Sequence, residues 1–283
     1  MIPAPFDYVR AGSADEALAL LAEHGDEAKL LAGGHSLLPV MKLRLAVPGV
    51  LVDIGRIAEL RYIRVEGEEV AVGALTRDRE LEHSALLQHE VPLLAHVAGQ
   101  VGDPQVRARG TIGGSLAHGD AASDLPTAVL ALGGTLVIQG PSGRRTVAAT
   151  EFFKGFFETA IGEDELLVEI RVPRTGHVGW GYEKFTRRAN DWPIIAVAAV
   201  DGRVAMANMG PTVLRAAATE RALAEGSAPA DAAALAHEGT SPSGDMHATP
   251  EYRQHLAREL TRRALESALA VTVPGPAGQL PAR

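Results

Sequence analysis

The sequence has no cysteine among its 283 residues. This absence excludes disulfide bonds, thiolate metal sites and any iron–sulfur cluster held by this chain alone, and it favours a cytosolic protein. The 10 histidines are scattered without the spacing that is typical of metal ligands. We therefore predict no metal site in this chain.

Long apolar runs are also absent. The run Ile194–Val200 is much shorter than the roughly 18 residues that a membrane-spanning helix needs. The segment Met1–Asp7 lacks the basic and apolar regions of a signal peptide. We therefore expect a cytoplasmic protein without an integral membrane segment.

Several common enzyme motifs are missing as well. The sequence contains neither G-x-G-x-x-G nor G-x-x-x-x-G-K-[ST], which excludes a Rossmann dinucleotide site and a P-loop. It also lacks G-x-S-x-G and H-E-x-x-H, and we predict no catalytic side chain in this chain. The excess of 35 acidic over 27 basic residues argues against a nucleic-acid partner.

Two glycine pairs are the most informative feature that is present. Gly33-Gly34 and Gly113-Gly114 lie 80 residues apart, and each follows a segment that is typical of a strand. A backbone without Cβ lets a large ligand come close and lets N–H groups turn inward around an anion. Two such segments can clamp a diphosphate, which predicts a dinucleotide site. A tight strand-to-helix turn is the commoner reason for one isolated pair.

The surrounding pattern predicts an α+β protein. In residues 1–55, Ser13–Glu16 is a capping box for a helix, Ser36 can cap a helical turn, and strands are expected at 29–32 and 50–54. In the next unit, strands are expected at 62–65, 70–74, 135–139, 145–148 and 166–172, and helices at 91–102, from 125 onward and at 151–157. The second glycine pair is expected in a loop.

The pattern changes near residue 175, where we place a domain boundary. Three strands in a meander are expected at 180–186, 194–200 and 203–209, and the strongest helix at 250–270. The tail at 274–278 contains Pro and Gly and is expected to remain unpacked.

Three segments resemble a known family. Ala32–Leu45, which reads AGGHSLLPVMKLRL, resembles the first flavin-binding segment of the medium subunit of carbon monoxide dehydrogenase and related molybdenum hydroxylases. Gly102–Ala117, continued by Asp120–Pro126, is similar to the second segment, and Lys184–Trp192 to a third. The resemblance runs over nearly the whole chain, and two long motifs at the right separation make it specific.

The resemblance implies a two-subdomain FAD-binding fold of the vanillyl-alcohol-oxidase-like type. Subdomains at about 1–55 and 56–175 would form an FAD-binding domain at 1–175, followed at 176–283 by a flavoprotein C-terminal domain of a small antiparallel sheet and helices. The implied function is electron transfer in an oxidoreductase. A large molybdopterin subunit would oxidise the substrate, a small subunit would carry two [2Fe–2S] clusters, and FAD would pass electrons to an external acceptor. The implied assembly is a heterohexamer, which the complex can bring to a membrane surface.

The resemblance also implies which residues bind FAD. Backbone N–H groups around the first glycine pair would face the diphosphate, and the second segment would contact its other side and the ribityl chain. Asp124 would accept a hydrogen bond from a hydroxyl of the flavin chain, with a helix cap as the alternative. The implied cofactor-binding residues are Ala32, Gly33, Gly34, His35, Ser36, Leu37, Thr111, Ile112, Gly113, Gly114, Ser115, Ala117, Asp124, Lys184 and Trp192.

Five positions have alternative roles. At the position of His35, some flavoproteins of the wider superfamily bond a histidine covalently to flavin, whereas the molybdenum hydroxylase branch implies noncovalent FAD. Lys184 would stabilise the reduced flavin from its pyrimidine end, or is a surface lysine. Trp192 would contact the flavin ring, or fills the interface between domains. Arg107 and Arg109 bind phosphate, face the iron–sulfur subunit, or are solvated.

Two other functions are compatible with the sequence. A stand-alone FAD-dependent oxidase or dehydrogenase of the same superfamily is the first, although residues 176–283 show no evident set of catalytic bases. The second is a non-enzymatic module whose glycine segments are purely structural. The substrate of the assembled enzyme, whether carbon monoxide, an aldehyde, a purine or an N-heterocycle, is set by the large subunit and not by these motifs.

Overall fold

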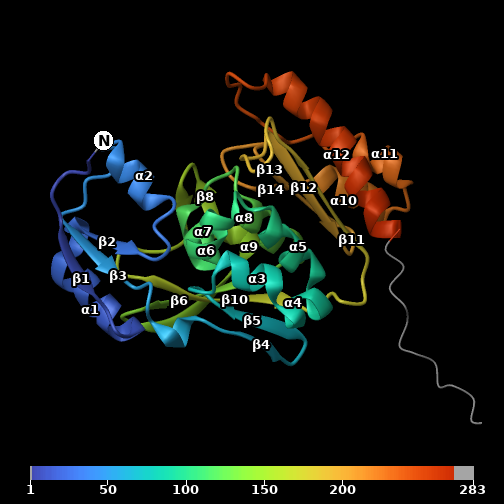
Figure 1. The fold of residues 1–283 in the computed structure, drawn as a ribbon. Coiled ribbons are helices and arrows are strands. Elements are labelled where there is room, and N and C mark those ends of the chain that lie inside the picture. The colour runs from blue at the N-terminus through green and yellow to red at the C-terminus, as the bar shows by residue number, and fades with distance from the viewer. Residues whose placement is uncertain (1, 271–283) are drawn as a thin grey trace, which may run out of the picture.

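The computed structural model describes residues 2–270 and begins with a small parallel sheet (Figure 1). Its strands β1 (Asp7–Arg10), β3 (Val50–Asp53) and β2 (Ala28–Leu31) lie in the order β1-β3-β2. Helix α1 (Ala14–His24) connects β1 to β2 and packs on the sheet, and 3-10 turns follow at Gly25–Glu27 and Ala58–Leu60. The strands near 29–32 and 50–54 are confirmed. The pattern does not predict β1, because three of its four residues are exposed.

The two predicted N-terminal caps have different outcomes. Ser13 Oγ accepts a hydrogen bond from the Glu16 N–H at 3.1 Å, which confirms where α1 begins. The Glu16 carboxylate accepts from the Gly12 N–H at 2.7 Å, so the reciprocal half of the capping box is displaced by one residue. Ser36 precedes α2 (Leu37–Lys42) but makes no capping hydrogen bond. That prediction is wrong because Ser36 is itself helical, with φ −99° and ψ −51°, whereas a capping residue is extended.

A five-stranded antiparallel sheet forms the next layer. Its strands, in spatial order, are β4 (Ile63–Glu66), β5 (Glu69–Gly73), β10 (Leu166–Pro173), β6 (Thr135–Gly140) and β7 (Gly143–Ala148). Val137 and Val168 on one face join the core of the N-terminal unit. Leu136, Ile138 and Ile170 on the other face pack against helices. Both faces of the central strands are therefore buried, which explains their nearly continuous apolar sequence.

Helices cover the second face of this sheet. They are α3 (Asp78–His83), α4 (Ala85–Glu90), α5 (Pro92–Gln100), α6 (Pro104–Arg109), α7 (Ile112–His118), α8 (Asp124–Leu132) and α9 (Ala149–Phe152). The second glycine pair thus lies in α7 and not in a loop. The predicted helix at 151–157 is also wrong, because the chain enters a hairpin of β8 (Phe153–Gly155) and β9 (Glu158–Thr159), in whose turn Phe157 has φ 56°.

The C-terminal part contains a four-stranded antiparallel sheet. Its elements are β11 (Trp180–Phe185), β12 (Ile195–Val200), β13 (Arg203–Ala207), β14 (Leu214–Arg215), α10 (Ala217–Ala224), α11 (Pro229–Ala233) and α12 (Pro250–Ala270). The predicted meander therefore gains a short fourth strand. Along β12, Ala196 and Ala198 belong to the core around α8, and Ile195 and Val197 to the core under α12. The mixed fold and the small C-terminal sheet with helices are confirmed.

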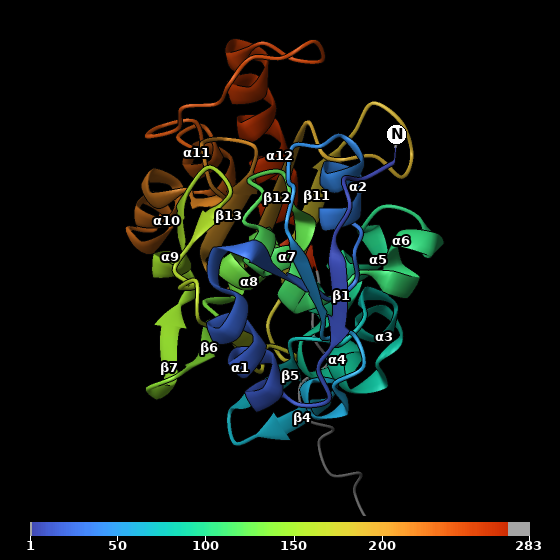
Figure 2. The same cartoon turned by 90° about the vertical axis from the view of Figure 1, so that its left-hand side faces the viewer.

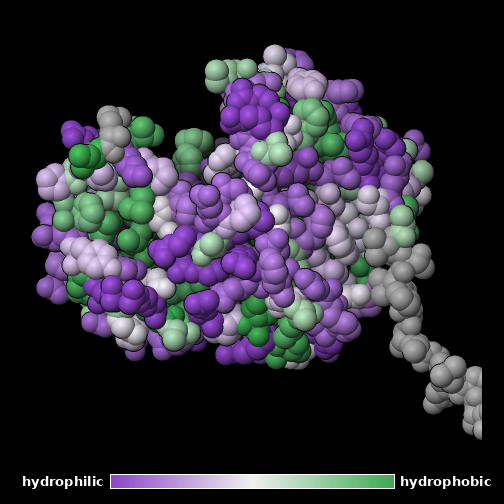
Figure 3. All heavy atoms as spheres, in the orientation of Figure 1, coloured by the Kyte–Doolittle hydropathy of each residue, from purple (hydrophilic) through white to green (hydrophobic). Residues whose placement is uncertain are grey.

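Helix α8 is the layer between the two larger sheets. All 9 of its residues are buried, because the five-stranded sheet lies on one side and β12 and β13 lie on the other. Seen along the perpendicular view, the N-terminal sheet and α1 stand in front of these layers (Figure 2). The molecular surface is hollowed between the lobe that contains α2 and the lobe that contains α12 (Figure 3).

Two further expectations concern a membrane-spanning segment and the C-terminal tail. Within the described residues, no helix combines the length and apolar character that crossing a bilayer requires. The tail at 274–278 lies outside the described residues.

Candidate flavin site

The two glycine segments lie directly against each other. A Cβ on Gly33 would come within 2.4 Å of the Arg109 carbonyl oxygen and 3.1 Å of the Gly110 Cα. On the facing side, a Cβ on Gly114 would lie 3.9 Å from the Cβ of Ala32. The structure therefore brings together the two segments that the sequence singles out. Gly33 is required by the close approach of two backbones, a reason that local sequence does not reveal.

The first segment has a row of backbone donors without protein partners. Gly34 has φ 81°, a left-handed conformation that redirects the chain before α2. No hydrogen bond within residues 2–270 is found for the N–H groups of Gly33, Gly34, His35, Ser36 and Leu37. Successive unpaired N–H groups around a left-handed residue are the arrangement that binds phosphate oxygens. The residues present therefore fit a diphosphate.

The second segment is a rigid wall. Thr111 caps α7, with its Oγ1 accepting from the Gly114 N–H at 3.2 Å. The N–H groups of Ile112 and Gly113 donate to the carbonyls of Thr76 at 3.1 Å and Ala74 at 2.9 Å. Because these N–H groups are already bonded, backbone donors for an anion come mainly from the first segment. Ser115 is half-buried and Ala117 is exposed on the same helix.

Asp124 and Lys184 form a buried ion pair between the two larger sheets. Lys184 Nζ lies 2.8 Å from Asp124 Oδ2 and donates a second hydrogen bond to the Gln100 carbonyl at 2.9 Å. The Tyr182 hydroxyl donates to Asp124 Oδ1 at 2.5 Å. The lysine side chain is only 8% exposed, so a surface role is wrong. Ser123 is the residue that precedes α8, and the carboxylate bonds side chains, so the cap alternative for Asp124 is also wrong.

Burial controls the ionisation of this cluster. It raises the pKa of Asp124, and the Lys184 ammonium opposes that rise. It also raises the pKa of Tyr182, an effect that the Asp124 charge reinforces. The phenol therefore keeps its proton and remains a hydrogen-bond donor to the carboxylate.

The remaining predicted residues lie at the surface or are already paired. Trp192 is 57% exposed, so it does not fill the domain interface. His35 is exposed on the first segment. Arg107 pairs with Glu82 at 2.8 Å, whereas Arg109 is exposed, and no ion pair is found for it in the described part of the chain.

Sequence reasoning misses two residues at this junction. The Arg77 guanidinium donates to the Arg109 carbonyl and to the Gly55 carbonyl, the second at 3.3 Å. Asp78 is buried against Gly110, and within residues 2–270 its Oδ1 has no hydrogen-bond partner. The only local signal is the succession of a basic and an acidic residue, Arg77 and Asp78, at the start of helix α3. It is weak because the partner carbonyl of Arg77 lies 32 residues later.

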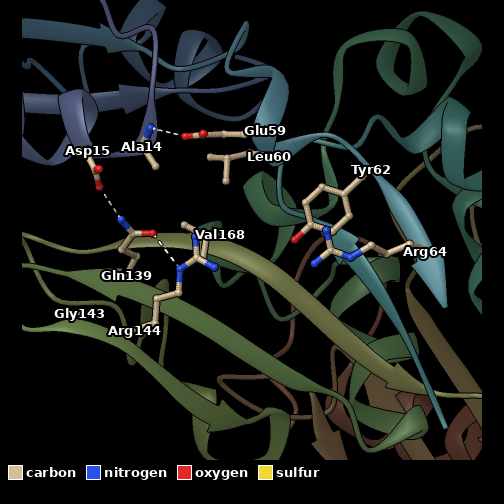
Figure 4. A pocket seen from close by; sticks show the side chains of 10 residues that line it. All are labelled: Ala14, Asp15, Glu59, Leu60, Tyr62, Arg64, Gln139, Gly143, Arg144 and Val168. Carbon is tan, nitrogen blue, oxygen red and sulfur yellow. Dashed lines mark hydrogen bonds between the residues drawn. The ribbon is translucent and has the colours of Figure 1, made fainter. Parts of the chain in front are cut away.

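Two cavities lie outside this junction. One, of about 360 Å³, lies under α1 on the face of the five-stranded sheet that carries Val168, opposite to the face that the helices cover (Figure 4). There the Arg64 guanidinium stacks 4.2 Å from the centre of the Tyr62 ring, and Gln139 bonds Asp15 and Arg144. Another of about 390 Å³ opens beside Gly55. None of the predicted cofactor-binding residues lines either cavity.

Asp124→Ala is expected to lower the free energy of unfolding by about 3–5 kcal/mol, because it leaves a buried ammonium without its partner. Urea unfolding followed by circular dichroism measures this. The control Asp191→Ala removes a carboxylate whose partner Arg188 is 70% exposed, and should lower the free energy of unfolding far less because solvent screens the pair. Equal effects of the two substitutions would contradict the buried pair.

Asp78 makes stability depend on pH. Burial raises the pKa of its carboxyl to about 7, above its value in an unfolded chain. Between about pH 4 and pH 7 the folded state therefore binds more protons than the unfolded state, and the free energy of unfolding falls as pH rises. Asp78→Asn should flatten this fall in urea titrations at several pH values. An unchanged slope in the variant would show that another group causes it.

Two family models match the chain. The FAD binding domain in molybdopterin dehydrogenase matches residues 4–175, and the CO dehydrogenase flavoprotein C-terminal domain matches residues 180–268. The carbon monoxide dehydrogenase medium chain of Hydrogenophaga pseudoflava is 44% identical over 290 residues, which cover 95% of this chain and 99% of the relative.

Further relatives extend this similarity to other substrates and to solved structures. The 6-hydroxypseudooxynicotine dehydrogenase complex subunit alpha of Paenarthrobacter nicotinovorans is 37% identical, covering 95% of this chain and 96% of the relative. A chain in the structure of the Hydrogenophaga pseudoflava carbon monoxide dehydrogenase that lacks the Mo-pyranopterin moiety superposes with a TM-score of 0.92 at 45% identity, covering 95% of this chain and 99% of that one. The chain therefore belongs to the family of FAD-binding medium subunits of carbon monoxide dehydrogenase-type molybdenum hydroxylases.

Proposed function

We propose that this FAD-binding oxidoreductase subunit takes electrons from [2Fe–2S] clusters of a small partner subunit and delivers them to an external acceptor. FAD supplies the capacity to accept and release electrons. The observation that carries the proposal is the row of N–H groups at Gly33–Leu37, which find no hydrogen-bond partner within residues 2–270 and lie against the second glycine segment. This row provides a diphosphate site in a chain that has no cysteine to hold a cluster of its own.

The proposal assigns a role to each part of the site. The first segment holds the diphosphate, and Thr111–Ser115 and Ala117 border it. Lys184 has one N–H left after its bonds to Asp124 and Gln100, and the carboxylate has spare lone pairs for a hydroxyl of the flavin chain. The exposed rings of Trp192 and His35 remain accessible to the flavin. FAD is bound noncovalently, so acid denaturation should release the colour into the supernatant.

The assembly is the second part of the proposal. The relatives are named as medium chains or as subunits of a complex. We place the molybdopterin centre in a large partner subunit and propose a heterohexameric, cytoplasmic complex that can associate peripherally with a membrane.

Division into an FAD-binding domain at 1–175 and a C-terminal domain at 176–283 is supported by the two matched ranges, 4–175 and 180–268.

Gly33→Ala should weaken FAD binding at least about tenfold, because the added Cβ meets the Arg109 carbonyl oxygen at 2.4 Å and forces the two segments apart. Isothermal titration of the apo-chain with FAD measures this. Gly99→Ala is the matched control, since a Cβ on this residue of α5 would make an ordinary 3.4 Å contact with the Glu82 side chain. Wild-type affinity in Gly33→Ala would show that the glycine segments do not form the site.

The isolated flavin-loaded chain should not be reduced by carbon monoxide, aldehydes, purines or N-heterocycles, because substrate oxidation is assigned to the large subunit. The measurement is the visible flavin absorbance under anaerobic conditions. The same chain purified with the products of neighbouring iron–sulfur and molybdopterin genes should be bleached by the substrate of the complex. Bleaching of the isolated chain would instead favour the stand-alone oxidase or dehydrogenase.

A further inference from the structure

Arg77 lies where the two glycine segments meet. Its guanidinium donates to the carbonyl of Arg109, the same oxygen that a Cβ on Gly33 would strike. Its Nη2 also donates to the Gly55 carbonyl at 3.3 Å. A Cβ on Gly55 would lie 3.7 Å from this nitrogen and 3.0 Å from the Ala32 carbonyl oxygen. The cation is thus in the immediate surroundings of both segments.

The Arg77 guanidinium forms no ion pair within the described part of the chain. Of its neighbours, Arg61 pairs with Glu80 at 2.7 Å and Arg107 with Glu82 at 2.8 Å, but residues 2–270 provide no ion pair for Arg77 or Arg109. Arg77 is half-buried, and burial, followed by repulsion from Arg109, lowers its pKa. The nearby Glu80 and Asp78 carboxylates oppose this lowering without reversing it. A half-buried cation beside a second cation is costly unless an anion approaches.

We infer that Arg77 is a cofactor-binding residue of this chain, whose guanidinium neutralises the FAD diphosphate and fixes the spacing of the two glycine segments. The inference rests on the proposed FAD site. The free N–H groups at Gly33–Leu37 contribute only partial charges, whereas Arg77 contributes a full one. A guanidinium suits both tasks because it has five donors, of which the two carbonyls use two.

The two tasks can be separated by substitution. Arg77→Gln keeps an amide donor for a carbonyl and removes the charge, whereas Arg77→Lys keeps the charge and removes the planar fork. Arg79→Gln makes the same charge change two residues later, at an exposed position of α3, and is the matched control. Thermal unfolding of each apo-chain checks that the variants fold.

Isothermal titration of the full chain with FAD and, separately, with riboflavin provides the test. Arg77→Gln should weaken FAD binding by about tenfold to about a hundredfold, the range for a hydrogen bond to a charged group, and leave riboflavin binding unchanged. The wild-type affinity for FAD should fall toward about 1 M salt, where the Debye length is about 3 Å. This dependence should be flatter in Arg77→Gln and retained in Arg77→Lys.

Several results would overturn the inference. Arg77→Gln with wild-type FAD affinity and salt dependence would do so. So would equal losses in Arg77→Gln and Arg77→Lys with the salt dependence intact, since Arg77 would then only brace the fold. If Arg77→Gln does not fold, two other results decide against the inference. One is that the FAD affinity of the wild-type chain does not change with salt. The other is that Arg77→Lys loses the salt dependence. A wild-type chain that binds no FAD would instead overturn the proposed function and this inference with it.

Discussion

The close approach of two backbone segments at the Arg109 carbonyl is the contact on which the site depends. Gly33 permits it because a Cβ there would sit 2.4 Å from the oxygen, far inside van der Waals contact. Arg77 donates to the same carbonyl, and Asp78 fills the space behind Gly110. Two segments that are distant in the chain thereby become the two walls of the proposed FAD site.

The ion pair between Asp124 and Lys184 connects this site to the C-terminal sheet. Lys184 lies on β11 and reaches the first residue of α8, so its ammonium is fixed relative to the layer that supports α7. A shift of β11 by one residue would present Glu183 or Phe185 to the carboxylate in place of the lysine. The pair therefore favours a single register of the sheet against α8, and it holds the Lys184 ammonium at the start of that helix.

Local sequence predicts the elements well where a periodic apolar pattern coincides with burial. The strand Ile195–Val200 is apolar throughout because α8 covers one face and α12 the other. Prediction fails where a tertiary contact decides the backbone. Ser36 adopts a helical conformation and caps nothing, and the Phe153–Thr159 hairpin replaces most of the helix expected at 151–157. Thr111 begins a helix whose N–H groups bond carbonyls of another segment.

The sequence by itself determined the family and the cofactor, because the residues that carry the resemblance lie in contiguous segments with recognisable residue types. Only the tertiary structure decided which donors remain free and which charges are paired. Gly113 uses its N–H on Ala74, Lys184 reaches a carbonyl 84 residues away, and Arg77 bonds one 32 residues away. Such contacts depend on chain segments that folding brings together, so no local pattern contains them.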